Sequence, residues 1–413
     1  MNKRDIHVYF DHCSTGEAIP LGILTAQCIR GKELFSFAFD TEFLNRRDIA
    51  SLDPDLQFYA GSQFTSKANF GLFMDSAPDR WGRKLMQRRE AIRARHANEK
   101  PRSLMESDYL LGVYDETRMG ALRFRLSPDG IFLNNDRSMA APPWTQLREL
   151  EEACRHLERE TATDEHEKWL SMLIAPGSSL GGARPKANIS DPDGNLWIAK
   201  FPSHHDEENV SAWEYTVMRM AHDAGLSVPE CRLEKFSCQG STFLVKRFDR
   251  QKTLRIHFAS AMTLLGKTDG ANAEDGSSYL DIAQFITEYG AKPQDDLQEL
   301  WRRIVFSIAI SNTDDHLRNH GFLLTPQGWR LSPAYDINPN ANGQGLSLNI
   351  SDVDNALDFD LALEVAPMFR LDRDTANKAL SQIKDTVSHF RFYAERSAIP
   401  PAEQERMAPA FRF

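Results

Sequence analysis

Three side chains with short, oxygen-bearing ends lie near one another in the last third of the sequence. Asp314 and Asn319 stand in the string NTDDHLRN, residues 312–319, and Asp336 follows shortly after it. Phosphoryl transfer uses groups of these types: one carboxylate orients or deprotonates the acceptor hydroxyl, while an amide and a second carboxylate hold Mg²⁺ against nucleotide phosphates. The three residue types are therefore suited to phosphoryl transfer.

The spacing of these residues favours the same chemistry. A protein-kinase catalytic loop places its Asn five positions after its catalytic Asp, and a metal-binding Asp follows on a later turn. Asp314 and Asn319 have this spacing. Taken alone, the string D-x-H-x-x-N also fits a buried polar pair or a structural metal site, so the rest of the chain has to decide.

Length and composition restrict the class of protein. A chain of 413 residues is too long for one ordinary core and predicts two or three domains. Its residues are 41% hydrophobic and 26% charged, which is typical of a soluble globular protein. The net charge of −10 argues against a general affinity for nucleic acid.

The cysteines and the apolar runs predict the compartment. Five cysteines, none in C-x-x-C spacing, form no recognisable zinc set and favour a reducing cytosol. The N-terminus has no apolar signal core, and no run approaches the ~18 apolar residues of a membrane span. We therefore expect a cytoplasmic protein without a membrane partner.

The N-terminal part predicts strands followed by one basic helix. Residues 6–40 are β-rich, with glycine and proline between the short runs. From residue 77 the pattern becomes helical, and Pro78 and Asp79 suit a helix start. The helix is rich in arginine, so its exposed face is either simply solvated or able to contact phosphate or an acidic partner.

A glycine-containing loop and a following hairpin predict a phosphate-binding element. Gly181 and Gly182 let the backbone approach a ligand closely, although the loop is not a Walker A motif and could be a plain turn. Residues 186–201 then read as two strands with a turn at 191–194. Lys200 lies on the returning strand, where a kinase keeps its phosphate-pairing lysine. A solvent-facing lysine is the alternative.

The second half predicts helices around the 312–319 loop. A helix beginning near residue 207 carries Glu214, which either pairs with Lys200 or is an ordinary surface glutamate. Residues 242–248 read as a strand whose backbone could bind an adenine edge. The other predicted elements are helices at 280–289 and 295–310, a short strand at 329–332, and a mostly helical C-terminal part with a frayed tail after Pro400-Pro401.

Together these strings resemble the HipA family of bacterial toxin kinases. They occur in the family order and cover most of the chain, from about residue 5 to about residue 390. The strings are Asp108–Val113, Gly120–Phe124, Ser179–Lys186, Ile198–Pro202, Lys246–Arg250, Asn312–Asn319 and Tyr335-Asp336.

The resemblance implies a fold and a division of the chain. The expected fold is α+β, a two-lobed fold like those of protein kinases and phosphoinositide kinases, with an extra N-terminal β-rich subdomain and an all-α C-terminal lobe. The expected parts are residues 1–145 for the β-rich subdomain, 146–250 for the ATP-binding small lobe and 251–413 for the helical lobe.

The resemblance also implies a function: an ATP- and Mg²⁺-dependent serine/threonine protein kinase that is the toxin of a toxin–antitoxin pair and inhibits growth. By position, Asp314 is the catalytic base, and Asn319 and Asp336 bind Mg²⁺. The predicted nucleotide-binding residues are Gly181, Gly182, Ala183, Arg184, Pro185, Lys186, Lys200, Lys246, Arg247, Phe248, His316, Asn319, Tyr335 and Asp336. Ser179 falls on the autophosphorylated loop serine of the family.

The family implies partners as well. These are HipB, a small helix-turn-helix antitoxin, operator DNA bound mainly through it, and a protein substrate such as an aminoacyl-tRNA synthetase. The loop departs from some members, because it reads GGARPK where they have Gly-Ala-Gln-x-Lys, and Ser178 competes with Ser179 as the phosphosite. The alternative functions are a structural co-repressor with little kinase activity and a small-molecule phosphotransferase.

Overall fold

The computed structural model describes two compact units. The described residues are 3–46, 51–136, 140–158, 173 and 184–413. Unit 1 consists of residues 1–204 and 246–259, and unit 2 of residues 205–245 and 260–413. The predicted division into three parts, with boundaries at residues 145 and 250, is a different division of the chain and stays a prediction.

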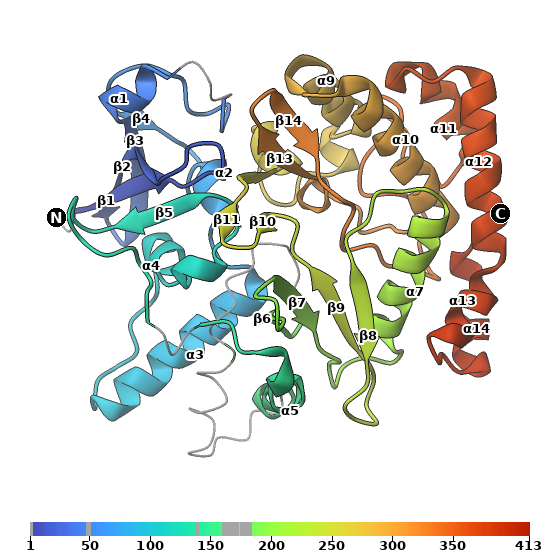
Figure 1. Cartoon of the computed structure of the whole chain (residues 1–413), viewed down its shortest axis with the longest axis horizontal. Helices are drawn as coiled ribbons and strands as arrows, with labels where there is room; N and C mark the ends of the chain where they lie inside the picture. The colour runs from blue at the N-terminus through green and yellow to red at the C-terminus, as the bar shows by residue number, and fades with distance from the viewer. Residues whose placement is uncertain (1–2, 47–50, 137–139, 159–172, 174–183) are drawn as a thin grey trace. The chain divides into compact units, whose positions relative to one another are not determined.

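Unit 1 begins with a five-stranded antiparallel sheet, drawn in blue to cyan in Figure 1. The strand order is β4-β3-β2-β1-β5. Ile6, Val8 and Phe10 are buried on one face of β1, as the alternating sequence requires, and this confirms the predicted strands. The bounds are Lys3–Phe10 for β1, Ile19–Ile29 for β2, Lys32–Phe39 for β3, Gln63–Phe64 for β4 and Leu122–Arg125 for β5.

The rest of unit 1 includes the predicted phosphate-binding hairpin and the predicted basic helix. Its strands β6 (Lys186–Ser190) and β7 (Leu196–Lys200) pair in antiparallel register, as predicted. The predicted basic helix is α3, which Asp79 caps by accepting a hydrogen bond from Gly82 N at 2.8 Å. The other elements are α1 (Thr41–Leu44), α2 (Gly71–Met74), α3 (Arg80–His96), α4 (Glu106–Leu111), α5 (Leu147–Glu158), β10 (Arg250–Gln251) and β11 (Leu254–Arg255).

Unit 2 is mostly helical, but it also contains strands. The predicted all-α C-terminal lobe carries a hairpin of β13 (Gly321–Thr325) and β14 (Gly328–Leu331), of which the sequence predicted only the second strand. A second hairpin joins β8 (Cys231–Glu234) to β9 (Thr242–Lys246), and β12 (Phe258–Ser260) lies where the chain enters unit 2 again. The helices are α7 (Val210–Asp223), α8 (Ala261–Leu264), α9 (Tyr279–Tyr289), α10 (Pro293–Ala309), α11 (Phe359–Val365), α12 (Arg373–Ser388), α13 (Phe390–Arg396) and α14 (Pro401–Met407).

The C-terminal tail is ordered, so the prediction that it frays after Pro400-Pro401 is wrong. Pro401 is the first residue of α14, a position that suits proline because its missing N–H would have no helical partner there. Beyond this helix, the ring of Phe411 stacks on that of Phe390 with 4.2 Å between the ring centroids, and Arg412 N donates to Ala309 O at 2.7 Å. The proline pair therefore marks the start of a helix, and the segment after that helix packs against the core.

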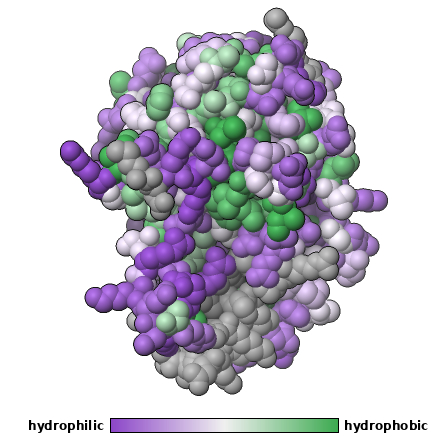
Figure 2. All heavy atoms as spheres, turned by 90° about the vertical axis from the view of Figure 1, so that its left-hand side faces the viewer, coloured by the Kyte–Doolittle hydropathy of each residue, from purple (hydrophilic) through white to green (hydrophobic). Residues whose placement is uncertain are grey.

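The surface combines polar and apolar side chains. Figure 2 shows hydrophobic atoms next to strongly hydrophilic ones on one face of the molecule. Large apolar side chains exposed on the N-terminal sheet include Ile23, Leu34 and Phe64. Among the described residues, no helix combines the length and the apolar character that crossing a membrane requires.

We expect one buried carboxyl group of unit 1 to make its stability depend on pH. Asp53 is buried, and burial raises its pKa to about 6 although Leu72 N and Asp55 N donate to it. The ordinary pKa in an unfolded chain is about 3.9, so the folded state binds this proton more tightly and stability falls as pH rises from about 4 to about 6. Asp53→Asn should remove that part of the slope, of order 2 kcal/mol, in urea unfolding midpoints measured across this range.

The matched control is Asp193→Asn, because Asp193 is an exposed aspartate in the β6–β7 turn of the same unit. It should keep the wild-type slope. If Asp53→Asn also keeps the wild-type slope, the buried carboxyl group is not the source of the pH dependence.

Candidate active site

The loop between α10 and β13 folds so that Asp314 and Asn319 contact each other. The carbonyl oxygen of Asp314 accepts one hydrogen bond from His316 N at 3.0 Å and another from Asn319 Nδ2 at 2.8 Å. The second bond closes the five-residue spacing that the sequence singled out. It uses the amide nitrogen of Asn319, whereas its Oδ1 is buried and has no hydrogen-bond partner in the protein. An oxygen in this position is available to a ligand.

The two adjacent aspartates of this loop have different surroundings. Asp314 is exposed, whereas only 5% of Asp315 is accessible. Oδ2 of Asp315 accepts hydrogen bonds from Tyr279 OH at 2.7 Å and Ser307 Oγ at 3.1 Å, and its Oδ1 lies 3.0 Å from His320 Nε2. Asp315 therefore anchors the loop to α9, α10 and the start of β13, and leaves Asp314 at the surface.

Burial and these partners act in opposite directions on Asp315. Burial alone would raise the pKa of its carboxyl group, but the neighbouring His320 and the hydrogen bonds from Tyr279 and Ser307 outweigh burial and lower it. The carboxylate is therefore ionised at neutral pH and fully used by the fold. It has little capacity left to act on a substrate.

A second loop, residues 335–347, is fastened to the first. The connections are hydrogen bonds from Tyr335 OH to Arg318 O at 2.7 Å, from Asn338 N to Asn312 Oδ1 at 3.4 Å, from Asn340 Nδ2 to Thr313 Oγ1 at 2.7 Å and from Ser347 Oγ to Thr313 O at 2.7 Å. Asp336 lies within this fastened stretch and is half-buried. The structure thus connects the segment that carries Asp336 to the loop that carries Asp314 and Asn319.

Two residues of these loops have unusual backbone conformations. Ser311, which precedes the first loop, has φ of 51°, and Asp336 has φ of 57°. Residues other than glycine rarely adopt this left-handed region, and strain of this kind is concentrated at functional sites. At Ser311 the side chain is also held, because Arg412 Nε donates to its Oγ at 3.1 Å.

The residue types of the two loops fit Mg²⁺. This ion prefers oxygen ligands and commonly binds proteins through one or two side chains together with phosphates and water. The carboxylate of Asp336 and the unpaired Oδ1 of Asn319 are ligands of this kind. The described residues contain no cluster of three or more His, Cys, Asp or Glu side chains arranged for a metal, so an all-protein metal cage is not formed there.

The predicted lysines of unit 1 lie opposite each other on the hairpin. Lys186 of β6 pairs in register with Lys200 of β7, so the two side chains leave the same face of the sheet. Lys186 is buried, and its Nζ lies 3.1 Å from the capping residue Asp79. Lys200 is half-buried. One lysine is therefore anchored by a carboxylate of its own unit, and their predicted contacts with phosphate stay predictions.

The predicted glycine-containing loop falls only partly in the described residues. Arg184 is half-buried, and the carbonyl oxygen of Pro185 accepts a hydrogen bond from Phe201 N at 2.9 Å. The remaining predicted loop residues lie outside the described residues: Ser178, Ser179, Gly181, Gly182 and Ala183.

The predicted adenine-binding segment, residues 246–248, is held by a buried ionic cluster. Nη2 of Arg247 lies 2.7 Å from Asp249 Oδ2, and both side chains have 0% exposure. Nη1 of Arg247 donates to Thr117 O at 2.6 Å and to Asn188 Oδ1 at 2.9 Å. The side chain of Arg247 therefore belongs to the core of unit 1, and its backbone N–H donates to Leu196 O at 2.9 Å. The predicted contact of this segment with adenine stays a prediction.

A second arginine completes this cluster. Arg250 Nη1 lies 2.6 Å from Asp249 Oδ2, and Gly120 N donates to the same oxygen at 2.9 Å. Burial would raise the pKa of Asp249, but Arg247, Arg250 and the Gly120 N–H outweigh it and hold the pKa well below its usual range. The cluster therefore joins two strings of the sequence analysis, Lys246–Arg250 and Gly120–Phe124, through Asp249 and Gly120.

Two features of the site were missed at the sequence level. The Asp315–His320 contact joins an aspartate inside the string 312–319 to the histidine that directly follows it, and the spacing of an acid and a base was the available signal. The Arg247–Asp249 pair lies in the string KRFDR, where two alternate residues of opposite charge were the signal. Glu214 is buried, which excludes the surface alternative, and its predicted pairing with Lys200 stays a prediction.

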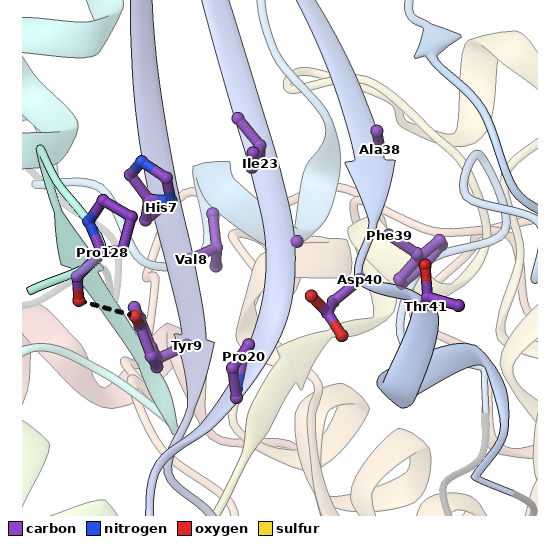
Figure 3. A pocket seen from close by; sticks show the side chains of 11 residues that line it. His7, Val8, Tyr9, Pro20, Ile23, Ala38, Phe39, Asp40, Thr41 and Pro128 are labelled. Carbon is purple, nitrogen blue, oxygen red and sulfur yellow. Dashed lines mark hydrogen bonds between the residues drawn. The ribbon is translucent and has the colours of Figure 1, made fainter.

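A hollow of about 340 Å³ lies on the N-terminal sheet, apart from all the predicted residues (Figure 3). Two of its polar side chains already serve the fold. Tyr9 OH donates to Pro128 O at 3.1 Å, and Asp40 caps α1 by accepting from Glu42 N at 2.8 Å. The predicted catalytic and metal-binding residues lie instead in the two loops of unit 2.

Comparison with known families identifies the chain. Residues 178–390, just over half of its length, match the model of the HipA-like C-terminal domain. The chain belongs to the HipA family. The matched region includes both loops of unit 2 and the β6–β7 hairpin.

Individual relatives agree with the family. A "Putative kinase" of Haemophilus influenzae is 31% identical over 179 residues, which are 39% of this chain and 52% of that protein. The "Serine/threonine-protein kinase toxin HipA" of Shewanella oneidensis is 27% identical over 225 residues, which are 47% of this chain and 50% of that protein. The chain thus spans about half the length of the curated relatives it matches.

A solved HipA chain shares the fold. It comes from the complex of Shewanella oneidensis HipA, HipB and operator DNA, and it matches with a TM-score of 0.65 at 18% identity over 98% of this chain and 94% of that chain. This likeness confirms the predicted α+β, kinase-like fold of the HipA family.

We expect the ionic cluster of unit 1 to be essential for its stability. Asp249→Ala leaves the buried guanidinium groups of Arg247 and Arg250 without their carboxylate, and breaking a buried pair in this way costs about 3–5 kcal/mol. The loss should appear as a lower urea midpoint, followed by tryptophan fluorescence. Glu99→Ala is the control, because its pair with Arg93 is exposed and should be worth less than about 1 kcal/mol. Equal, small effects of both variants would contradict this account.

Proposed function

We propose that this HipA-family chain is an ATP- and Mg²⁺-dependent serine/threonine protein kinase. The observation that carries the proposal is the pair of fastened loops in unit 2, where an exposed Asp314 is bonded to Asn319 and the segment of Asp336 is held against them. The relatives from Haemophilus influenzae and Shewanella oneidensis, which are named as kinases, support it.

Each residue has a role that its surroundings allow. Asp314 is exposed, so the hydroxyl group of a protein substrate can reach it, and its carboxylate would orient that hydroxyl and accept the proton. Asn319 Oδ1 and the Asp336 carboxylate would hold Mg²⁺, which neutralises charge on the phosphates when bound. His316 and Tyr335 flank these residues in the two loops, and the unpaired Nδ1 of His316 is free for a nucleotide contact.

Unit 1 would contribute nucleotide binding. Lys200 would pair with phosphate oxygens, and Lys186, held by Asp79, would add positive charge on the same face of the hairpin. The backbone at residues 246–248 would lie along adenine, since the Arg247 side chain is engaged inside the unit. Most of the rate enhancement would then come from positioning and charge neutralisation.

We further propose that the chain is the toxin of a type II toxin–antitoxin pair. Its partner would be a HipB-like helix-turn-helix antitoxin, and its substrate a serine or threonine of a cellular protein, with an aminoacyl-tRNA synthetase or another translation component as the first candidate. The related Shewanella oneidensis protein is named a toxin, and the solved HipA was crystallised with HipB and operator DNA. With a net charge of −10, this chain would contact the operator mainly through the antitoxin.

Autophosphorylation of the glycine-containing loop is part of this proposal. A phosphate on Ser179, or on Ser178, adds about −1.5 to −2 charge beside the predicted phosphate-binding residues and should weaken ATP binding. Peptide mass spectrometry after incubation with ATP and Mg²⁺ should find the label there, and Ser179→Ala should lose most of it. A preparation that phosphorylates another protein but carries no phosphate at residues 178–179 would exclude this step.

We expect Asp314→Asn to lower phosphoryl transfer by at least about 100-fold, the lower end of what general-base catalysis contributes. The amide keeps the size of the side chain but cannot accept the proton, while ATP affinity should stay within a few fold. Transfer of labelled phosphate to protein measures the first quantity and calorimetry the second. Asp352→Asn, an exposed aspartate of the same unit, is the control and should keep wild-type turnover.

Growth provides the cellular readout of the same variant. Without an antitoxin, the wild-type chain should arrest growth, and the Asp314→Asn chain should not. Near-wild-type turnover of Asp314→Asn would remove Asp314 from the base position. Equal toxicity of both chains would instead favour sequestration of a partner over catalysis.

A further inference from the structure

Asn338 is the residue of the second loop whose side chain the proposed function leaves unexplained. Its Oδ1 is buried and has no hydrogen-bond partner in the protein. Buried polar atoms in native proteins are nearly always paired, and an unpaired one indicates a bound water, an ion or a functional role. Within the two fastened loops, Asn319 Oδ1 is in the same condition.

Asn338 lies two positions after Asp336 in the second loop. The two residues are half-buried, and Ile337 between them is buried at 6% exposure. The position of Asn338 is fixed because its N–H donates to Asn312 Oδ1 at 3.4 Å.

Asn340, in the same loop, has a side chain whose two polar atoms are both hydrogen-bonded within the protein. Asn340 Nδ2 donates to Thr313 Oγ1 at 2.7 Å, and Asn340 Oδ1 accepts from Asn342 N at 3.0 Å. Both ends of that amide are used by the fold. The amide oxygen of Asn338 differs because the protein leaves it unused.

We propose that Asn338 supplies a further oxygen ligand, beside Asn319 and Asp336, to the Mg²⁺ of the bound nucleotide, directly or through a water molecule. This inference rests on the proposed kinase function and extends its metal site. Amide oxygens are ordinary ligands of hard divalent cations. With a single carboxylate in the set, the protein would bind the ion mainly together with the phosphates of the nucleotide, because a cation with so little compensating charge is held weakly by the protein alone.

The test is calorimetric binding of a non-hydrolysable ATP analogue to the full chain, with Mg²⁺ present and with Mg²⁺ removed by a chelator. For Asn338→Ala, we expect the gain in affinity that Mg²⁺ provides to fall by about tenfold or more, while the Mg²⁺-free affinity stays near that of the wild type. Asn342→Ala is the matched control and should keep the wild-type gain, since Asn342 is an exposed asparagine of the same loop.

A second variant keeps the test decisive if Asn338→Ala does not fold. Asn338→Asp retains the shape and adds a charge, so the gain from Mg²⁺ should be kept or increased and the Mg²⁺-free affinity should fall through repulsion of the phosphates. An unchanged gain in Asn338→Ala overturns the inference, as does an equal loss with and without Mg²⁺ or a reduced gain in Asn338→Asp. If the wild-type chain binds no nucleotide under either condition, the proposed function itself fails.

Discussion

The hydrogen bond from Asn319 Nδ2 to the carbonyl oxygen of Asp314 is the contact on which the proposed catalytic arrangement depends. It fixes the proposed base and a proposed metal ligand in one short turn. The amide nitrogen of Asn319 makes this bond, whereas its amide oxygen has no partner in the protein and stays available to a ligand. Buried Asp315 anchors this turn by accepting hydrogen bonds from Tyr279 and Ser307. The position of the exposed Asp314 thus follows from the burial of its neighbour.

In unit 1, a buried ionic pair and a backbone hydrogen bond from Arg247 N to Leu196 O hold the segment after β9 in place. Arg247 and Asp249 are fully buried, and their charges compensate each other within the unit. Such a pair adds little net stability by itself, but removing one member is costly, so the geometry of the segment is strongly enforced. Lys186 is held by Asp79 in a similar way.

Much of this arrangement could be predicted from the sequence. Alternating residues predicted β1 and β3 of the first sheet, and helical periodicity predicted α7, α9 and α10, because these patterns follow directly from which face is buried. The spacing of Asp314 and Asn319 predicted a common loop, and the structure brings the two residues into contact. Their catalytic roles remain proposals.

Other features depend on partners distant in the sequence, and a local pattern cannot show them. β13 is a continuous apolar run without alternation, so its pairing with β14 was not visible. The tail after Pro400-Pro401 was expected to fray, yet Phe411 stacks on Phe390, a contact that exists only once α13 is in place. Likewise, nothing local distinguishes the buried Asp315 from the exposed Asp314. That difference comes from Tyr279 and Ser307, which other helices supply.

The most direct test of the account is the Mg²⁺ dependence of ATP binding when Asp336 is changed. The wild-type chain should bind a non-hydrolysable ATP analogue more tightly with Mg²⁺ than without it. Asp336→Ala removes the one proposed carboxylate ligand, so its affinity should fall and should no longer respond to Mg²⁺. Unchanged, Mg²⁺-dependent binding by Asp336→Ala would contradict the assignment of the two fastened loops as the metal and nucleotide site.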